Sequence, residues 1–292
     1  MKVFIDGSYF SKEDAKISVF DHGLLYGDGI FEGIRIYNGK AFLLKEHIDR
    51  LFDCAKFTML NIPYSKTEMI DLVKESIIQN DKNKISDSGY IRLLITRGSG
   101  DLGLDPAKCS KVSVIIITDK ISLYPEEYYS KGISIITSSI RRNSADSCDP
   151  RAKSLNYLNN ILAKMEAKNA GCLEALLLNH NGYVAECTAD NIFIIKNNIL
   201  MTPDVSCGAL EGITRNTVID IAVSEKIKVE QKNLTLFDIY TADECFITGS
   251  GAEIMPVTSV DKRIIKNGTP GPITLNLLDL FREFINNYNY EK

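Results

Sequence analysis

Hairpin signals and helix signals alternate along the whole chain of 292 residues. Tight turns such as Asn38-Gly39 separate short runs of β-branched and other apolar residues, which is the pattern of antiparallel hairpins. Between these runs, apolar residues recur at helical spacing, as in the stretches 44–59 and 66–80. Because hairpins and helices are mixed and no regular strand–helix–strand repeat appears, the sequence predicts an α+β protein.

The length of the chain suggests two domains, at roughly 150 residues per domain. Between Lys120 and Gly132 the periodicity lapses into a polar stretch with one proline, which is typical of a linker. We therefore expect an N-terminal domain over residues 1–121, a linker over 122–132 and a C-terminal domain over 133–292.

The charge and cysteine content of the chain argue against several classes of protein. Basic and acidic side chains nearly balance, at a net charge of −4, so neither a nucleic-acid nor a membrane surface is expected. No apolar run reaches the ~18 residues of a membrane span, and no secretory leader is visible after Met1. The seven cysteines include no CxxC pair, which predicts buried thiols and no metal site. We expect a protein of the reducing cytoplasm.

Three segments with glycine are candidates for close backbone approach to a ligand. The glycines between residues 23 and 33 lack the spacing of a dinucleotide fingerprint, so we expect a tight loop before a strand over 34–37. The segment 208–215 opens an amphipathic helix, where backbone N–H groups and the Thr214 hydroxyl suit a phosphate. Glycine and threonine also begin helices as plain caps. The cluster 248–253 fits either a ligand contact or a bulge.

Lys153 precedes Ser154, a suitable N-cap, and a helix whose apolar residues recur from Leu155 to Met165. The positive end of a helix dipole at this place disfavours an ammonium, and so favours the neutral amine that Schiff-base chemistry requires. Tyr157, four residues on, would share the helix face of Lys153. The alternative is an exposed lysine that is tolerated at a helix start.

Glu186 follows the second strand of a hairpin predicted over residues 174–185. A buried carboxylate at this place needs a cationic partner, and a protonated pyridine nitrogen is one such partner. The alternative is an exposed loop glutamate, which is the common environment of this residue type. The residues alone leave both interpretations open.

Taken in chain order, these segments resemble the class IV aminotransferases, which use pyridoxal 5′-phosphate and share the architecture called fold type IV. The resemblance extends from Phe4 to about Val260. It implies a smaller N-terminal α/β domain and a larger cofactor-binding C-terminal domain with a barrel-like sheet, with the active site between them. The motifs that carry it are Arg50 on the first helix, Arg151-Ala152-Lys153-Ser154-Leu155-Asn156-Tyr157, Glu186-Cys187-Thr188-Ala189-Asp190-Asn191, Glu211-Gly212-Ile213-Thr214-Arg215 and Gly249-Ser250-Gly251-Ala252-Glu253-Ile254.

The resemblance implies a role for each residue that contacts the cofactor. Lys153 would form the Schiff base with it and then move the proton at the substrate Cα. Glu186 would pair with the pyridine nitrogen and keep it protonated, so that the ring accepts electrons from the reacting carbon. Tyr157 would form a hydrogen bond with the phenolic oxygen of the ring. The phosphate would be held by Arg50, Ile213, Thr214 and Ser250.

Within this class, the N-terminal half is most similar to branched-chain amino acid aminotransferases, through Phe31-Glu32-Gly33-Ile34-Arg35, Tyr90-Ile91-Arg92 and the loop 100–106. The resemblance implies transamination of L-leucine, L-isoleucine and L-valine with 2-oxoglutarate, in a homodimer or a larger homo-oligomer. The Tyr90 hydroxyl and the Ser250 and Gly251 amides would bind the substrate α-carboxylate, and Arg92 the distal carboxylate of glutamate. An apolar pocket would be formed by Tyr26, Phe31, Tyr90 and Leu104, of which Tyr26 and Leu104 would come from a neighbouring subunit.

Two alternatives keep the fold and change the reaction. A D-amino acid aminotransferase of this class is expected to carry an Arg-x-His pair near residues 101–106, and this chain has none there. An aminodeoxychorismate lyase usually lacks the run found at 31–35. A homologue that only binds the cofactor would have no need of both Lys153 and Glu186.

Overall fold

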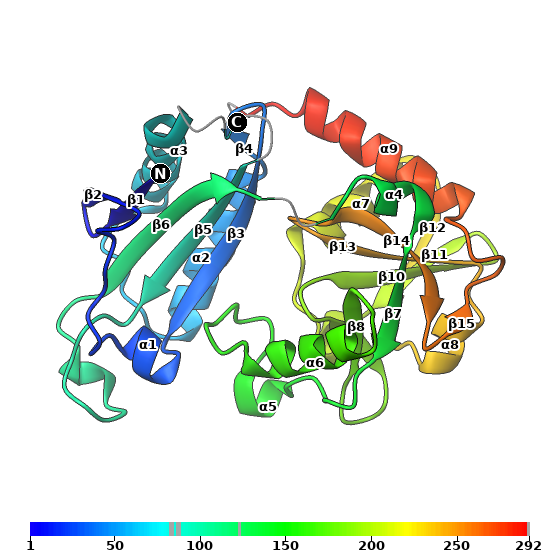
Figure 1. The fold of residues 1–292 in the computed structure, drawn as a ribbon, viewed down its shortest axis with the longest axis horizontal. Helices are drawn as coiled ribbons and strands as arrows, with labels where there is room; N and C mark the ends of the chain where they lie inside the picture. Colours follow the sequence, from blue (N-terminus) through cyan, green and yellow to red (C-terminus); the bar gives the residue numbers. More distant parts are fainter. Residues whose placement is uncertain (82–84, 86–88, 122–123, 291–292) are drawn as a thin grey trace. The chain divides into compact units, whose positions relative to one another are not determined.

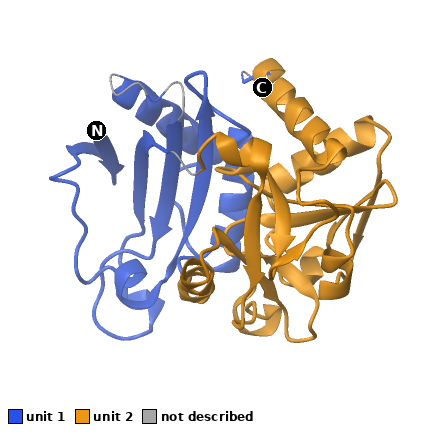
Figure 2. Cartoon of the chain, turned by 45° about the vertical axis from the view of Figure 1, so that its right-hand side comes forward, with its two compact units in different colours: residues 1–122, 152–156, 289–292 blue, residues 123–151, 157–288 orange. Residues whose placement is uncertain are grey.

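The computed structural model describes residues 1–81, 85, 89–121 and 124–290, and its chain divides into two compact units (Figure 2). Unit 1 comprises residues 1–122, 152–156 and 289–292, and unit 2 comprises residues 123–151 and 157–288. This division differs from the two continuous domains predicted over 1–121 and 133–292, because the short segment around Lys153 and the C-terminal residues belong to unit 1. In the predicted linker, residues 127–131 form a helix.

Unit 1 contains an antiparallel sheet with the strand order β2-β1-β6-β5-β3-β4 (Figure 1). Two helices, α2 and α3, pack on it, α2 against β3 and α3 against β6. The elements of this unit are β1 (Lys2–Ile5), β2 (Ser8–Ser11), α1 (His22–Tyr26), β3 (Gly29–Tyr37), β4 (Lys40–Ala41), α2 (Leu44–Phe57), α3 (Lys66–Asn80), β5 (Gly89–Thr96), the 3-10 helix η2 (Pro106–Lys108) and β6 (Ser113–Lys120).

The core of unit 1 follows from the alternation of side chains along its central strands. On β3, the even-numbered Ile30, Ile34 and Ile36 are fully buried, and on β5 the odd-numbered Ile91 and Leu93 are buried with them. This face receives the apolar sides of α2 and α3. The odd-numbered residues of β3 therefore point to the opposite face of the sheet.

Unit 2 contains a mixed sheet with the strand order β12-β11-β10-β13-β14-β7-β8-β9, and β15 pairs with β14. At its centre, Phe193 and Phe246 stack at a centroid distance of 4.9 Å on adjacent strands. Its elements are α4 (Glu127–Lys131), β7 (Ile133–Thr137), α5 (Ala145–Cys148), α6 (Leu158–Asn169), β8 (Glu174–Leu178), β9 (Val184–Cys187), β10 (Asn191–Lys196), β11 (Ile199–Pro203), the 3-10 helix η3 (Val205–Cys207), α7 (Ile213–Ser224), β12 (Lys228–Lys232), α8 (Leu236–Tyr240), β13 (Glu244–Gly249), β14 (Glu253–Val260), β15 (Arg263–Ile264) and α9 (Pro272–Asn287).

Several predicted elements are confirmed at the residue level. The helix over 66–80 has the bounds expected, and Ser65 and Glu68 form its capping box through hydrogen bonds of 3.2 and 2.7 Å. The predicted loop over 23–33 is wrong, because β3 begins at Gly29 and α1 precedes it. Position 29 has no room for a side chain, because a Cβ added to Gly29 would lie 2.6 Å from the carbonyl oxygen of Ile95 on the paired strand.

The helix predicted to start at Leu155 begins at Leu158 instead, with Tyr157 as its N-cap residue. Residues 153–155 do not join the helix because they form a β-bridge with β3, in which Ser154 pairs with Ile30. The Phe31 amide donates to the Lys153 carbonyl and the Leu155 amide to the Gly29 carbonyl, both at 2.9 Å. Ser154 is therefore not an N-cap, and the helix-dipole argument for a neutral Lys153 amine is wrong.

The face of α6 that packs on the sheet of unit 2 also differs from the prediction. The small residues Ala163 and Ala167 are fully buried against β8, so the helix approaches the sheet closely. Its large apolar side chains lie on the other face, where Leu158, Ile161, Leu162 and Met165 are exposed by 67, 53, 42 and 55%. The predicted apolar stripe is thus a surface feature of this chain.

Candidate active site

The face of β3 and β5 opposite the core brings three of the predicted site residues of unit 1 together: Phe31, Tyr90 and Arg92. Gly33 is paired with Arg92 in the antiparallel register, and Tyr90 lies two residues before Arg92, on the same face. The Arg92 guanidinium carbon lies 4.4 Å from the ring centroid of Phe31 and 5.5 Å from that of Tyr90. A guanidinium thus lies against two aromatic rings, at distances where cation–π attraction operates.

Lys153 reaches the same place from the segment that pairs with β3. Its Nζ lies 4.6 Å from the centroid of the Phe31 ring. Its backbone is held on two sides, because the carbonyl accepts from the Phe31 amide and the amide donates to Cys54 Sγ on α2 at 3.4 Å. Unit 1 therefore presents an amine and a guanidinium against one apolar ring.

Gly33 leaves the space that the Tyr90 side chain occupies. A Cβ on Gly33 would lie 1.9 Å from the Tyr90 hydroxyl oxygen and 2.8 Å from its ring carbon Cζ. The phenol therefore lies across the backbone of β3 at a place where only glycine fits. This close approach explains the glycine without any need for a loop.

Arg50, the residue predicted to hold the phosphate, lies on α2 and forms a bidentate pair with Glu32. Its Nε and Nη2 donate to the two carboxylate oxygens, both at 2.8 Å. His47, one turn earlier on the helix, contributes Nδ1 at 2.7 Å. Neither Glu32 nor His47 was assigned a role from the sequence. The strict alternation of β3, which places Glu32 among buried isoleucines, is the signal that could have identified the carboxylate.

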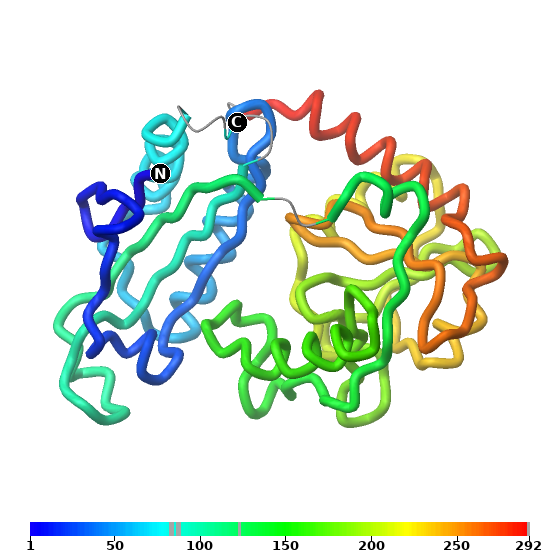
Figure 3. Tube along the Cα trace, viewed as in Figure 1, coloured from blue at the N-terminus to red at the C-terminus, as the bar shows by residue number. Residues whose placement is uncertain are grey.

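The helix α1 and the loop after β5 lie side by side (Figure 3), and a β-bridge joins Asp21 to Ser99. The Tyr26 hydroxyl accepts from the Gly103 amide at 2.9 Å, and the buried His22 pairs through Nε2 with the Asp101 carbonyl at 2.9 Å. Leu104 itself is 82% exposed. The two residues predicted to act in a neighbouring subunit thus form one local cluster on unit 1.

In unit 2, Glu186 lies inside strand β9 and is buried, so the predictions of a position after the strand and of an exposed loop are wrong. Arg142 Nη2 contacts its Oε1 at 2.5 Å. The Leu210 amide and Asn191 Nδ2 donate to its Oε2 at 2.9 and 3.3 Å. The cationic partner that burial requires is therefore present in the chain itself, as Arg142.

Arg142 and Asn191 connect this carboxylate to the loop before α7. Arg142 is buried and donates to the Gly208 carbonyl at 3.1 Å and to Asn160 Oδ1 at 2.8 Å. Asn191 also donates to the Leu210 carbonyl at 2.9 Å. Sequence analysis assigned neither residue a role of its own. Both fix the distance between Glu186 and the segment that was predicted to bind a phosphate.

The start of α7 is an uncapped helix N-terminus. Gly212 is the N-cap residue and therefore supplies no side-chain cap, and the following Ile213 and Thr214 begin the helix. An added Cβ on Gly212 would lie 2.0 Å from Asn191 Oδ1, so the loop packs too closely for any larger residue. Thr214 is buried at this helix start.

The turn between β13 and β14 carries Ser250 and Gly251. The Thr248 side chain at the end of β13 is buried, and its Oγ1 has no hydrogen-bond partner among the residues that the structure describes. Gly249 packs on Asp190, because an added Cβ would lie 2.1 Å from the Asp190 Oδ1. A buried hydroxyl without a partner is costly, which fits a site that a polar ligand completes.

The predicted site residues are divided between the two units. Unit 1 holds Tyr26, Phe31, Arg50, Tyr90, Arg92, Leu104 and Lys153, and unit 2 holds Tyr157, Glu186, Ile213, Thr214, Ser250 and Gly251.

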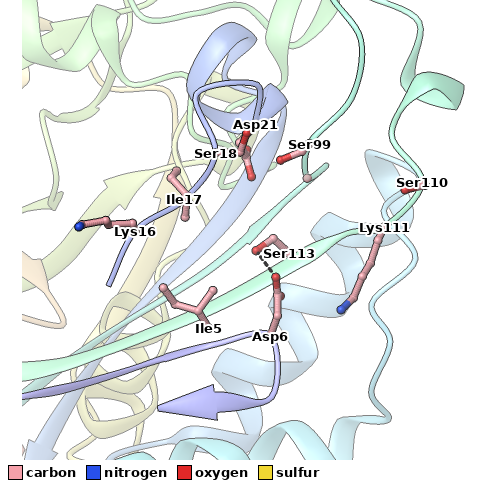
Figure 4. A pocket seen from close by; sticks show the side chains of 11 residues that line it. Ile5, Asp6, Lys16, Ile17, Ser18, Asp21, Ser99, Ser110, Lys111 and Ser113 are labelled. Carbon is pink, nitrogen blue, oxygen red and sulfur yellow. Dashed lines mark hydrogen bonds between the residues drawn. The ribbon is translucent and has the colours of Figure 1, made fainter. Parts of the chain in front are cut away.

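Unit 1 contains a cavity of about 260 Å³ (Figure 4). It is lined by β1, the segment 16–21 and parts of the segment 98–113. Its two carboxylates already have partners in the protein: Asp6 accepts from Ser113 at 3.0 Å, and Asp21 from Thr96 at 2.8 Å. None of the predicted site residues lines this cavity.

The comparisons with known proteins agree on one family. The sequence model described as amino-transferase class IV matches residues 29–260. The putative branched-chain-amino-acid aminotransferase of Methanocaldococcus jannaschii is 51% identical over 283 residues, which cover 97% of this chain and 96% of that protein. The D-alanine aminotransferase of Listeria monocytogenes is 36% identical over 295 residues, or 98% of this chain and 96% of the relative.

Solved structures give the same result. The branched-chain amino acid aminotransferase of Escherichia coli matches with a TM-score of 0.93 at 34% identity, covering 97% of this chain and 93% of that one. A second branched-chain amino acid aminotransferase, solved as a complex with N-(5′-phosphopyridoxyl)-L-glutamate, matches with a TM-score of 0.91 at 36% identity, covering 99% and 95%.

Proposed function

We propose that this chain, which belongs to the class IV aminotransferases, transfers amino groups between branched-chain L-amino acids and 2-oxo acids. The observation that carries the proposal is the cluster of unit 1 in which the Lys153 amine and the Arg92 guanidinium both lie against the Phe31 ring. It combines an apolar surface for a hydrocarbon side chain with a cation for a carboxylate. The relatives and structures named for branched-chain substrates support it.

Class IV aminotransferases use pyridoxal 5′-phosphate, and the residues of this chain fit that cofactor. An anionic phosphate suits the N-terminus of α7, because its N-cap residue Gly212 has no side chain to bond the first amides. A protonated ring nitrogen suits the buried Glu186. The Thr248 hydroxyl, two residues before Ser250, is buried without a hydrogen-bond partner among the described residues, which fits a polar site that a ligand completes. When bound, the cofactor supplies an electron sink for the carbanion at the substrate Cα.

Each residue that is proposed to hold the cofactor then has a defined role. Lys153 Nζ would hold the cofactor and would move the proton at the substrate Cα. Glu186 holds a proton on the ring nitrogen, and its own carboxylate is kept in place by Arg142. Tyr157 forms a hydrogen bond with the phenolic oxygen. Arg50, Ile213, Thr214 and Ser250 hold the phosphate.

The substrate is bound by residues of both kinds, apolar and charged. The Tyr90 hydroxyl and the amides of Ser250 and Gly251 bind the α-carboxylate. Phe31 and the ring of Tyr90, with Tyr26 and Leu104, surround a branched side chain. Arg92 binds the distal carboxylate of glutamate or 2-oxoglutarate, so that one site accepts an apolar and an acidic side chain in turn. The relative that was solved with a phosphopyridoxyl glutamate supports an acidic co-substrate.

The active form is proposed to be a homodimer at least. Two apolar surfaces of the chain support it: the exposed face of α6, and the α1 region, where Val19 is 68%, Phe20 50% and Leu24 60% exposed. Contiguous exposed apolar side chains of this kind mark association surfaces. A second copy that covers the α1 region would bring Tyr26 and Leu104 to a neighbouring site.

A reducing compartment, the cytoplasm, is proposed on the state of the thiols. All seven cysteines lie in the described part of the chain and are free, and four of them are buried. No helix in the described ranges is both long and apolar enough to cross a membrane.

One activity panel tests the proposal. The purified holoenzyme is incubated with 2-oxoglutarate and either L-leucine or D-alanine, and separately with aminodeoxychorismate, while glutamate or pyruvate formation is followed. We expect turnover of L-leucine. Turnover of D-alanine alone would instead support the activity for which the Listeria monocytogenes relative is named, and pyruvate from aminodeoxychorismate would support a lyase. Absence of all three refutes the proposed function.

A further inference from the structure

We propose that Glu32 is a positioning residue for the phosphate of the cofactor, acting through the guanidinium of Arg50. This inference rests on the proposed function, in which Arg50 holds the phosphate. Glu32 itself lies on the core side of β3 and is fully buried. It therefore does not contact the cofactor directly, and its effect is transmitted through the orientation of Arg50.

The burial of Glu32 requires an explanation, because its neighbours on the same face of β3 are apolar. Ile30 and Ile34 flank it, and both are fully buried. Removal of a lone carboxylate from water costs several kcal/mol, so such a residue persists in a core only when its partners compensate. A valine or isoleucine would complete the alternation of the strand at no such cost.

Both oxygens of Glu32 are bonded to side chains of a single helix. Arg50 donates Nε to Oε1 and Nη2 to Oε2, each at 2.8 Å. His47 donates Nδ1 to Oε2 at 2.7 Å. Since His47 and Arg50 are three residues apart, they lie on the same face of α2. The carboxylate thus holds this face of the helix against β3 at two points.

The charge states make this a stable arrangement at neutral pH. Burial by itself would raise the pKa of Glu32, but Arg50 and His47 hold it well below its usual range. Burial also lowers the pKa of His47, despite the opposing effect of Glu32. His47 is therefore neutral and uses its Nδ1 proton for Glu32, so that the cluster contains one negative and one positive charge.

The bidentate contact fixes the plane of the Arg50 guanidinium. An unrestrained arginine side chain samples many rotamers, and ordering it costs conformational entropy. Glu32 offsets that cost in the folded protein, before any ligand arrives. The Arg50 side chain remains 15% exposed, whereas Glu32 is fully covered, so the arginine is the member of the pair that is accessible from outside the core.

The same helix face is in contact with the segment of Lys153. Cys54, one turn after Arg50, accepts a hydrogen bond from the Lys153 amide at 3.4 Å. The charge of Lys153 also contributes to the lowered pKa of His47. The cluster of Glu32, His47 and Arg50 is therefore close to Lys153 within unit 1. A change in this cluster would alter the orientation of Arg50.

The test compares two ligands of the apo-protein, pyridoxal 5′-phosphate and pyridoxal, which lacks the phosphate. Glu32→Gln keeps the size of the side chain but removes its charge and one of its two acceptors for Arg50. We expect the affinity for pyridoxal 5′-phosphate to fall about 10- to 100-fold. The affinity for pyridoxal should change by no more than about two-fold. Both dissociation constants are measured by absorbance titration, with no need for turnover.

A matched control tests whether any polar defect in the same core has this effect. Ser76→Ala removes the buried hydrogen bond of 2.7 Å between Ser76 Oγ and Thr118 Oγ1, on α3 and β6. It should leave the ratio of the two affinities unchanged. Glu32→Asp, which keeps the charge and shortens the side chain, should show the same selective loss as Glu32→Gln, and it decides the matter should the glutamine variant not fold.

The outcomes separate this inference from the proposed function. Equal weakening of both ligands, or no weakening of either, in the Glu32 variants would show that Glu32 is structural only. Failure of the wild-type protein to bind either ligand would overturn the proposed function instead. Selective loss of the phosphorylated ligand supports both.

Discussion

Gly33→Ala should impair catalysis by displacing a hydroxyl while leaving the fold intact. An added Cβ would lie 1.9 Å from the Tyr90 hydroxyl oxygen, so the phenol has to move by about 1.5 Å to reach an ordinary contact of 3.4 Å. A displacement of this size removes the proposed hydrogen bond to the substrate α-carboxylate. A hydrogen bond to a charged group contributes about 1.5–3 kcal/mol, which corresponds to a loss of roughly 10- to 150-fold in kcat/KM.

The stability of this variant should barely change. The backbone of Gly33 is not in the left-handed region that only glycine tolerates, and alanine has a smaller entropic cost in a strand than glycine. The atom that must move is the far end of a side chain on an exposed face. The melting temperature should therefore stay within a few degrees of the wild type, as measured by calorimetry or circular dichroism.

A double-mutant cycle with Tyr90→Phe identifies the cause. If Gly33→Ala acts through the hydroxyl, its cost in the Tyr90→Phe background should be much smaller than in the wild type, since the group it displaces is already gone. Steady-state kinetics with L-leucine and 2-oxoglutarate provide the four kcat/KM values. A Gly33→Ala enzyme with wild-type kcat/KM, or strictly additive effects, would refute this reasoning.

Three other predictions concern separate sites. Lys153→Ala should abolish turnover while the protein still binds pyridoxal 5′-phosphate through its phosphate, as a stopped assay and a binding titration would show; retained transamination contradicts its role. Arg142→Ala leaves the Glu186 carboxylate buried without its cation, and should lower the free energy of unfolding by about 3–5 kcal/mol in urea; a loss below about 1 kcal/mol would mean that the pair is dispensable. Burial and the nearby Glu75 raise the pKa of Tyr9 to about 12. The folded protein therefore loses stability relative to the unfolded chain as the pH rises from the unfolded pKa of tyrosine, about 10, through about 12. Tyr9→Phe should remove this alkaline loss in thermal melts and leave stability at pH 7 unchanged or higher, because the Tyr9 hydroxyl is buried without a partner in the described chain.

Local signals in the sequence predicted local structure well. The capping box at Ser65 and Glu68 fixed the start of α3, and the Asn38-Gly39 turn fixed the hairpin of β3 and β4. These features succeed because each depends on residues within a few positions of one another. The α+β class followed from the same kind of signal.

The errors have a common cause, which is pairing between distant parts of the chain. Helical periodicity placed the start of α6 at Leu155, but hydrogen bonds from Leu155 and Phe31 across the edge of β3 keep this segment out of the helix. Likewise, Glu186 was left open between a buried and an exposed position, because its partner Arg142 is 44 residues away in sequence. Nothing in the local pattern reports such a partner.

The site residues illustrate the same limit. The predicted roles of Lys153, Phe31 and Arg92 depended on a resemblance to known enzymes, and the structure adds that Lys153 and Arg92 both lie against the Phe31 ring. The burial of Glu32 could have been predicted from the alternation of β3, because Glu32 is a charged residue at an inward position of an otherwise apolar strand face. Its partner Arg50 was identified for a different reason, so the link between the two emerged only from their geometry.

The segment 152–156 has a consequence for how this protein can be divided or rebuilt. The backbone passes from one unit to the other at four places, after residues 122, 151, 156 and 288. A protease that cleaves the chain near residue 122 would leave the two units connected by the three other crossings of the backbone. A fragment ending at residue 121 would lack the short piece that completes the edge of β3, together with the lysine it carries. Reassembly from two separately expressed halves should therefore fail, whereas a circular permutant opened at the Gly182 turn keeps every crossing and should fold.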